Sequence, residues 1–149
     1  MGPAGLPIDT ERLGPVEECG VFGVWAPGED VAKMSYYGLY ALQHRGQEAA
    51  GIAVGDGEQV LVYKDLGLVS QVFDEQTLEA MDGHVSVAPC RYSTTGSTAW
   101  ENAQPMFRTT SAGSVLALGH NGNLTNTDAL TDRAMELGIS GYQRGGTHS

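Results

Sequence analysis

The stretch VEECGVFGVW, residues 16–25, decides how the chain is interpreted, because two different kinds of sequence meet in it. Before it, residues 1–18 hold three prolines, three glycines and four acidic residues against one arginine, a composition that buries little apolar surface. After it, GVFGVW is typical of a β-strand whose glycines allow another backbone to come close. We therefore expect a disordered leader over residues 1–18 and a folded domain over residues 19–149.

Cys19 stands at this boundary and has two interpretations. A cysteine at the start of a strand is commonly a small buried side chain. Alternatively, removal of residues 1–18 as a propeptide exposes an N-terminal nucleophile, whose free α-amino group has a pKa of about 8 and serves as the base. An internal amide nitrogen is no base, so the second interpretation requires cleavage of the chain after Glu18.

Composition and charge exclude several classes of function. The chain has 149 residues, enough for one domain with a core, and carries eight basic against eighteen acidic residues, a net charge of −10. This charge argues against a nucleic-acid or anionic membrane surface. The four histidines match no metal-ligand spacing, no apolar stretch reaches the roughly 18 residues of a transmembrane helix, and the leader does not resemble a secretory signal. We expect a cytoplasmic protein with reduced cysteines and no cofactor of its own.

Helices and strands are predicted in groups rather than in strict alternation. Helices are expected over residues 30–46 (N-cap Asp30, stop Gly46), 74–81 and 126–138. Strands are expected over residues 20–25, 84–88 and 114–120, and a hairpin over residues 49–65. The long Ser/Thr-rich connection from Arg91 to about Gly113 is of a length that is commonly functional. This grouping predicts an α+β fold with antiparallel sheet layered against helices.

Two further stretches contain candidate chemistry. Arg91 follows a β-like run and precedes a Ser/Thr/Gly segment; it is either a surface arginine or a bidentate fork for a carboxylate, followed by a lid. The pair Asn121-Gly122 follows an apolar strand and is commonly a structural turn, but a side-chain amide and a backbone N–H can also form an oxyanion hole. With Cys19, these residues supply the parts that an amide-cleaving site needs.

Six longer motifs resemble the glutaminase domain of the amidophosphoribosyltransferases, which catalyse the first committed step of de novo purine synthesis: CGVFGVW, YYGLYALQHRGQEAAGIAV, GLVSQVF, RYSTTGS, ENAQPMF and LGHNGNLTN. The resemblance runs from Cys19 to about Gly138. It implies an N-terminal nucleophile (Ntn) hydrolase fold, an αββα sandwich with two antiparallel sheets. It also implies that residues 19–149 form part of a type 2 glutamine amidotransferase domain, incomplete at the C-terminus.

The resemblance also assigns roles to the catalytic candidates. Cys19 resembles the nucleophile of the family, freed by cleavage after Glu18. The Asn121 side chain and the Gly122 N–H resemble the two donors of the oxyanion hole. Together they imply that the side-chain amide of glutamine is cleaved through a glutamyl thioester, with release of ammonia.

The substrate-binding candidates follow from the same resemblance. Arg91 resembles the residue that holds the α-carboxylate of glutamine. Tyr92, Ser93 and Thr94 begin a segment, residues 92 to about 101, that resembles the glutamine loop of the family. This loop closes over the substrate.

The sequence departs from the family pattern in two places. Ala88-Pro89 precede Cys90 where the family has Gly-His, and a proline fits only an edge strand or a bulge, so the effect on the strand that aims Arg91 is open. The aspartate that grips the α-amino group of glutamine and the phosphoribosyltransferase domain have no match. The resemblance assigns phosphoribosyl pyrophosphate, Mg²⁺, an iron–sulfur cluster in some members and homo-oligomer formation to the full-length enzyme.

Two alternatives remain open. One is a catalytically silent, truncated fragment. The other is the amidotransferase domain of a glucosamine-6-phosphate synthase, whose fold also begins with a cysteine. The second is disfavoured, because that enzyme has Arg-Trp-Ala-Thr-His-Gly where this chain has RYSTTG.

Overall fold

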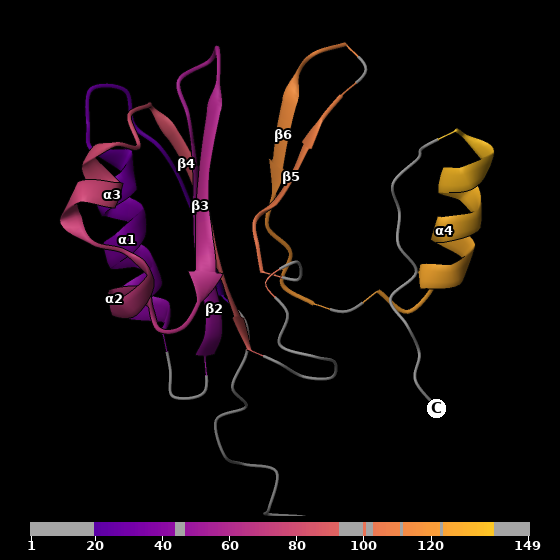
Figure 1. The fold of residues 1–149 in the computed structure, drawn as a ribbon, viewed down its shortest axis with the longest axis horizontal. Helices are drawn as coiled ribbons and strands as arrows, with labels where there is room; N and C mark the ends of the chain where they lie inside the picture. The colour runs from indigo at the N-terminus through magenta and orange to yellow at the C-terminus, as the bar shows by residue number, and fades with distance from the viewer. Residues whose placement is uncertain are drawn as a thin grey trace, which may run out of the picture.

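The computed structural model describes residues 20–43, 47–92, 100, 103–110, 112–122 and 124–138. The predicted leader and Cys19 lie outside these residues. A four-stranded antiparallel sheet forms the centre of the described structure, with helices on one face and a two-stranded antiparallel sheet on the other (Figure 1). The predicted α+β class with antiparallel sheets is confirmed.

The main sheet has the strand order β1-β4-β2-β3. Its strands are β1 (Gly20–Trp25), β2 (Gln47–Gly55), β3 (Val60–Leu66) and β4 (Val85–Tyr92). The predicted hairpin is present between β2 and β3, where the Asp56 carboxylate accepts hydrogen bonds of 2.8 Å from the N–H groups of Glu58 and Gln59. Gly57 has a φ of +98°, a conformation that favours glycine in such a turn.

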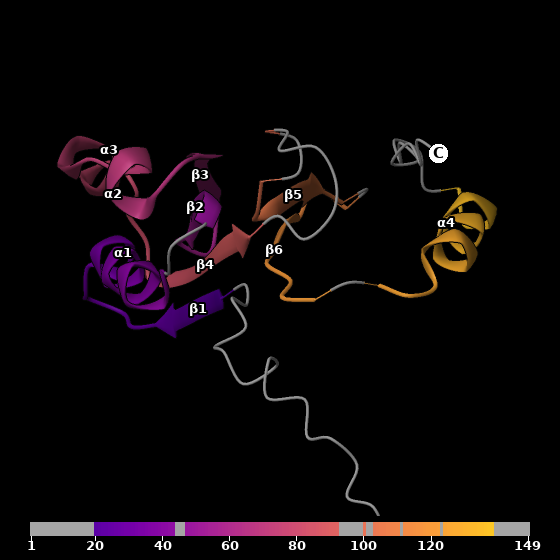
Figure 2. The same cartoon turned by 90° about the horizontal axis from the view of Figure 1, so that it is seen from below.

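Three helices cover one face of the main sheet: α1 (Val31–Leu42), α2 (Val69–Val72) and α3 (Glu75–Glu79) (Figure 2). The two predicted aspartate caps are confirmed, since Asp30 accepts from the N–H of Lys33 at 2.9 Å and Asp74 accepts from the N–H of Thr77 at 2.7 Å. These carboxylates satisfy N–H groups that the first turn of a helix leaves without intrahelical partners.

Two details of this layer differ from the prediction. Helix α1 ends at Leu42, four residues before the predicted stop at Gly46, because the backbone of Gln43 is extended. The Gln43 side chain then accepts a 2.8 Å hydrogen bond from the N–H of Val69, the first residue of α2. Helix α2 itself was not predicted, because its four residues are too few to show a helical period.

The hydrophobic core lies between the helices and the main sheet. Alternate residues of β1, β2 and β4 point into it, as the pairs Phe22↔Ala88 and Ala50↔Cys90 illustrate. The buried core residues are Val31, Ala32, Leu39, Ala50, Ile52, Val54, Val69, Val72, Phe73, Leu78, Met81, Ala88 and Cys90. A polar contact crosses this layer: the hydroxyl of Ser35 on α1 donates a 2.8 Å hydrogen bond to that of Ser86 on β4.

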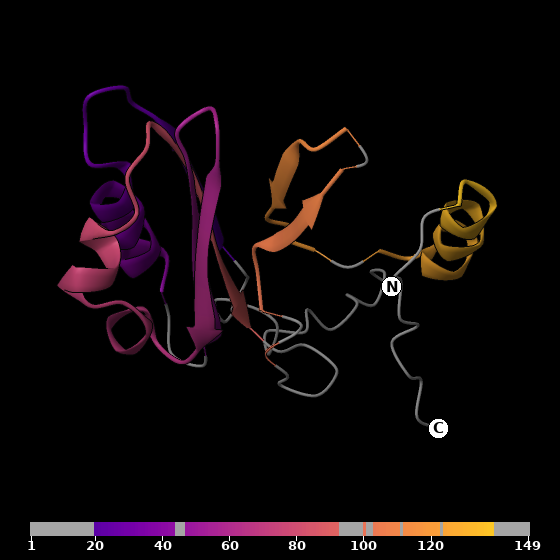
Figure 3. The same cartoon turned by 45° about the horizontal axis from the view of Figure 1, so that its top comes forward.

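The opposite face of the main sheet faces the hairpin of β5 (Met106–Thr109) and β6 (Val115–Leu118) (Figures 1 and 3). The prediction placed the residues of β5 in a long connection. This was wrong, because a four-residue strand with all its side chains exposed gives no alternation of apolar and polar residues.

Pro89 lies inside β4, which has a neighbouring strand on each side. It is paired with Val21 of β1, whereas the pairing of β4 with β2 stops at Ala50↔Cys90 and resumes at Ala53↔Val87. This interruption fits the missing N–H of proline. The expectation that Pro89 fits only an edge or a bulge was therefore wrong: β4 continues through it to Tyr92.

Helix α4 (Thr127–Glu136) begins after Asn126 and is followed by Gly138 at a φ of +72°, as predicted. It stands apart from both sheets (Figures 1 and 3) and leaves Leu130, Met135 and Leu137 exposed. Among the described residues, no helix has both the length and the apolar character needed to cross a membrane.

Candidate active site

Strand β4 carries Arg91 at the end of the main sheet, on the face opposite the helices. Ala88 and Cys90 belong to the core, and side chains alternate along a strand, so Pro89 and Arg91 point to the other face. Arg91 is half-buried and is paired with Ala49 of β2. Of the other substrate-binding candidates, Tyr92 ends the strand, and Ser93 and Thr94 lie outside the described residues.

The pair Asn121-Gly122 lies in the segment that leaves β6. At the start of this segment the backbone of Gly119 passes closely over Pro89: a Cβ added to the glycine would lie 3.3 Å from the ring. Gly122 has a φ of +142°, which favours glycine, and both Asn121 and Gly122 are exposed. The turn therefore begins over the residue that stands two positions before Arg91 in β4.

The described neighbours of Cys19 lie at the same end of the sheet. Gly20, which is covalently bonded to Cys19, pairs with Cys90, which is bonded to Arg91. A Cβ added to Gly20 would lie 3.2 Å from the sulfur of Cys90, so the two strands pack tightly at this point. The described chain therefore begins, at Gly20, beside the strand position that precedes Arg91.

Gln104, which the sequence did not single out, contacts the segment that leads to Asn121. Its side-chain oxygen Oε1 accepts a 2.7 Å hydrogen bond from the backbone N–H of His120, the residue before Asn121. The contact joins residues 16 positions apart, and no local pattern reports such a contact. The available signal was the position of Gln104 inside the motif ENAQPMF.

A second contact that the sequence did not reveal holds Trp100, near the end of the predicted glutamine loop. The indole N–H of Trp100 donates a 3.2 Å hydrogen bond to the carbonyl of Lys64 on β3, and the Lys64 ammonium lies 5.0 Å from the centre of its ring. The same ammonium donates to the carbonyl of Ala103. Burial, and then the nearby charge of Arg108, lower the pKa of Lys64 from its ordinary value.

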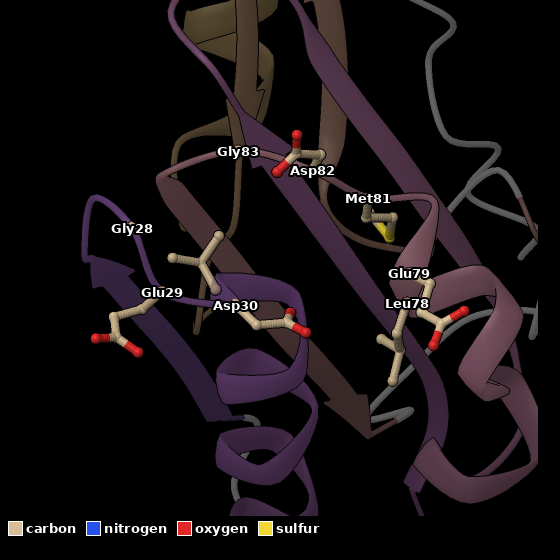
Figure 4. A pocket seen from close by; sticks show the side chains of 9 residues that line it. Gly28, Glu29, Asp30, Leu78, Glu79, Met81, Asp82 and Gly83 are labelled. Atoms are coloured by element: carbon tan, nitrogen blue, oxygen red, sulfur yellow. The ribbon is translucent and has the colours of Figure 1, made fainter.

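A separate cavity of about 460 Å³ lies at the other end of the main sheet, between the start of α1 and the residues after α3 (Figure 4). It is lined by Gly28, Glu29, Asp30, Val31, Leu78, Glu79, Met81, Asp82 and Gly83. Gly83 precedes Arg91 by eight residues, roughly 26 Å along an extended strand. The described residues that line this acidic cavity include no cysteine or arginine, so the cavity does not coincide with the predicted amide-cleaving site. Among the described residues, no cluster of three or more His, Cys, Asp or Glu side chains could hold a metal ion.

No protein-family model matches the chain. Curated sequences do: the amidophosphoribosyltransferase of Mycobacterium tuberculosis strain H37Rv is 77% identical over 135 residues, which are 91% of this chain and 26% of that protein. The amidophosphoribosyltransferase of Bacillus subtilis strain 168 is 46% identical over 130 residues, 87% of this chain and 27% of that protein. The chain thus spans about a quarter of the length of these relatives.

Solved structures agree with the sequence matches. The glutamine phosphoribosylpyrophosphate amidotransferase of B. subtilis, complexed with ADP and GMP, has 38% identity and a TM-score of 0.71 over 85% of this chain and 27% of its own. A structure described as the allosteric regulatory enzyme of purine biosynthesis has 41% identity and a TM-score of 0.73, covering 83% of this chain and 26% of its own. The helix layer, main sheet and β5–β6 hairpin are accordingly part of an Ntn hydrolase fold. Over most of its own length the chain thus matches the N-terminal quarter of proteins named amidophosphoribosyltransferase.

Proposed function

We propose that this chain is the glutaminase portion of an amidophosphoribosyltransferase, which releases ammonia from the side chain of glutamine. The observation that carries the proposal is that Pro89 and Arg91 lie on the face of the main sheet opposite the helices, at the end where β1 begins, and that Gly119, two residues before Asn121, passes closely over Pro89. In this proposal residues 1–18 are a propeptide, and residues 19–149 are the part of the glutamine amidotransferase domain that the chain contains.

The reaction starts at Cys19 once its α-amino group is free. The amine takes the thiol proton, and the sulfur attacks the side-chain amide carbon of glutamine. The side-chain N–H of Asn121 and the backbone N–H of Gly122 stabilise the resulting oxyanion; in comparable sites one such donor contributes about 2.7–4 kcal/mol to transition-state stabilisation. The α-ammonium returns the proton to the departing ammonia, leaving a glutamyl thioester that water hydrolyses to glutamate.

Arg91 and the loop after it select the substrate. The Arg91 guanidinium is suited to bind the α-carboxylate of glutamine with two parallel hydrogen bonds, an arrangement that fixes orientation as well as position. Tyr92, Ser93 and Thr94 continue from Arg91 into the loop that closes over glutamine. Trp100, near the end of this segment, is held on β3 by the carbonyl and the ammonium of Lys64.

The fate of the ammonia belongs to the remainder of the full-length enzyme. The solved relative from B. subtilis is a phosphoribosylpyrophosphate amidotransferase, and this chain covers 27% of it. We propose that ammonia displaces pyrophosphate from phosphoribosyl pyrophosphate in that remainder, which would also hold any Mg²⁺ or iron–sulfur cluster and form a cytoplasmic homo-oligomer.

The proposal is tested by mass spectrometry together with an affinity label. Intact mass is expected to show loss of residues 1–18, and the glutamine analogue diazo-oxo-norleucine is expected to label Cys19 in the mature chain. The Cys19→Ser variant should lose glutaminase activity and labelling, whereas Cys90→Ala, a change at the buried second cysteine, should retain both. A mature chain that neither takes the label nor releases ammonia would overturn the proposal and leave a catalytically silent protein.

A further inference from the structure

Gln104 lies where the main sheet meets the turn that contains Asn121 and Gly122. Its backbone is seated directly on β2: a Cβ added to Gly51 would lie 2.0 Å from the Gln104 carbonyl oxygen. Real Cβ atoms do not approach a backbone oxygen so closely, so the absence of a side chain at Gly51 is what admits Gln104 to the sheet surface.

The residues on either side of Gln104 are held as well. Ala103 is 1% exposed, and Pro105 is among the largest fully buried side chains. The carbonyl of Ala103 accepts a hydrogen bond from the ammonium of Lys64 on β3. The segment 103–105 is therefore fixed to both β2 and β3, and Gln104 projects from a rigid support.

The side chain of Gln104 extends the pairing of β5 with β6 beyond the last backbone pair. That pair is Met106↔Leu118, and two residues further outward in the same register stand Gln104 and His120. Here the Gln104 side-chain oxygen, rather than a backbone carbonyl, accepts the N–H of His120 at 2.7 Å. The amide thus holds the first residue outside the ladder, immediately before Asn121.

The turn consequently has two fixed points close to the proposed oxyanion donors. Gly119 rests on the ring of Pro89, and His120 is held by Gln104. Asn121 and Gly122, both exposed, follow these two residues directly in the chain. The positions of Gly119 and His120 therefore set where the backbone enters Asn121 and Gly122.

We propose that Gln104 is a positioning residue for the oxyanion hole: it acts through His120 and sets the direction of the Asn121 side chain and the Gly122 N–H. This inference rests on the proposed glutaminase function. Gln104 does not touch the reacting atoms, but a misplacement of about 1 Å can cost on the order of 100-fold in rate, because an oxyanion donor works only when it is aimed in advance.

The test compares substitutions that differ in one property. Gln104→Met keeps the length of the side chain but removes the acceptor, whereas Gln104→Glu keeps an acceptor oxygen at the same distance from the backbone. We expect Gln104→Met to lower kcat for glutamine hydrolysis roughly tenfold or more while KM stays within about twofold, because Arg91 is unchanged. Gln104→Glu should restore most of kcat. A wild-type kcat in Gln104→Met, an equal loss in both variants, or a rise in KM alone would overturn the proposal.

A second measurement does not depend on activity. Hydrogen exchange of the His120 amide, followed by NMR, should be slow in the wild type and in Gln104→Glu and markedly faster in Gln104→Met. Equal protection in all three proteins would overturn the positioning role. If Gln104→Met does not fold, Gln104→Asn, whose amide is one methylene shorter, takes its place with the same expected results. Because the exchange is measured without substrate, a wild type that lacks glutaminase activity would refute the proposed function separately from this contact.

Discussion

The two faces of the main sheet are built from the same strands but have different roles. The face toward α1–α3 carries apolar side chains that are buried together in the core. A hydrogen bond between Ser35 and Ser86 also connects α1 to this face. The other face carries glycine and proline, together with the polar residues Lys64 and Arg91, under a small hairpin whose apolar side chains are partly exposed. One set of alternate residues supplies stability, and the other set supports the segments that carry the candidate chemistry.

The neighbouring residues Gly51 and Ile52 of β2 illustrate this difference between the two faces, because successive residues of a strand point to opposite sides of the sheet. Ile52 is 0% exposed and belongs to the core, whereas Gly51 faces Gln104. Substitution of each residue should therefore separate a loss of stability from a loss of site geometry.

The largest effect is expected for Ile52→Ala. Removing a fully buried isoleucine side chain leaves a cavity, so the free energy of unfolding should fall by about 4 kcal/mol, and Ile52→Val should cost about 1 kcal/mol. Urea denaturation measures both values. The His120 amide of the folded fraction should keep its wild-type protection; its loss in Ile52→Val would contradict the separation of the two faces.

A somewhat smaller loss of stability, about 3 kcal/mol, is expected for Gly51→Ala, because the new Cβ collides with backbone rather than with a flexible side chain. In this variant the collision also displaces Gln104, so protection of the His120 amide should be lost. The matched control is Gly23→Ala in β1, where the nearest atom to an added Cβ is 3.8 Å away. A Gly51→Ala protein with wild-type stability and exchange would show that the segment 103–105 is not seated as described.

The sequence predicted the parts of the fold that depend on local patterns. Asp30 and Asp74 correctly predicted the starts of α1 and α3, and the turn residues around Asp56 correctly predicted the hairpin. Helix α2 was missed because its four residues are too few to show a helical period, and strand β5 was missed because its exposed residues show no alternation of apolar and polar side chains. The end of α1 was misplaced because Gln43 is used by α2, a contact between segments 26 residues apart.

For the candidate site, too, local sequence patterns predicted some residues but not the contacts between distant segments. Arg91, Asn121 and Gly122 were singled out because each lies in or soon after a predicted strand and within a recognisable motif, and they remain predictions as functional residues. Gln104 and Lys64 were not found, because their contacts join residues 16 and 39 positions apart. A polar side chain that supports another segment has no local signature, so the support of a site is harder to predict than its reacting groups.

Arg91→Lys tests whether the face of the main sheet opposite the helices binds the α-carboxylate of glutamine. A lysine ammonium does not reproduce the bidentate fork, so KM for glutamine should rise about tenfold, equivalent to about 1.4 kcal/mol, while kcat at saturation changes little. Steady-state ammonia release measures both constants. Arg108→Lys on β5 is the matched control and should leave KM unchanged. An unchanged KM in Arg91→Lys would remove this residue from the substrate site.

The smallest effect distinguishes the two faces by pH. Hydrogen bonds from the Thr77 hydroxyl, and then from its backbone N–H, hold the pKa of Asp74 below its ordinary value of 3.8. A lowered folded pKa means that this cap stabilises α3 fully above pH of about 4 and that the stabilisation is lost as pH falls through the folded pKa. Protection of the Thr77 amide, corrected for intrinsic exchange, should decline over that range in the wild type and stay level in Asp74→Asn, which keeps a cap oxygen that does not titrate. The His120 amide should not follow this decline, because its acceptor is the neutral amide of Gln104. A parallel loss of protection at the Thr77 and His120 amides would mean that acid unfolds the layers on both faces of the main sheet as one unit. The two faces would then differ in packing but not in their stability toward acid.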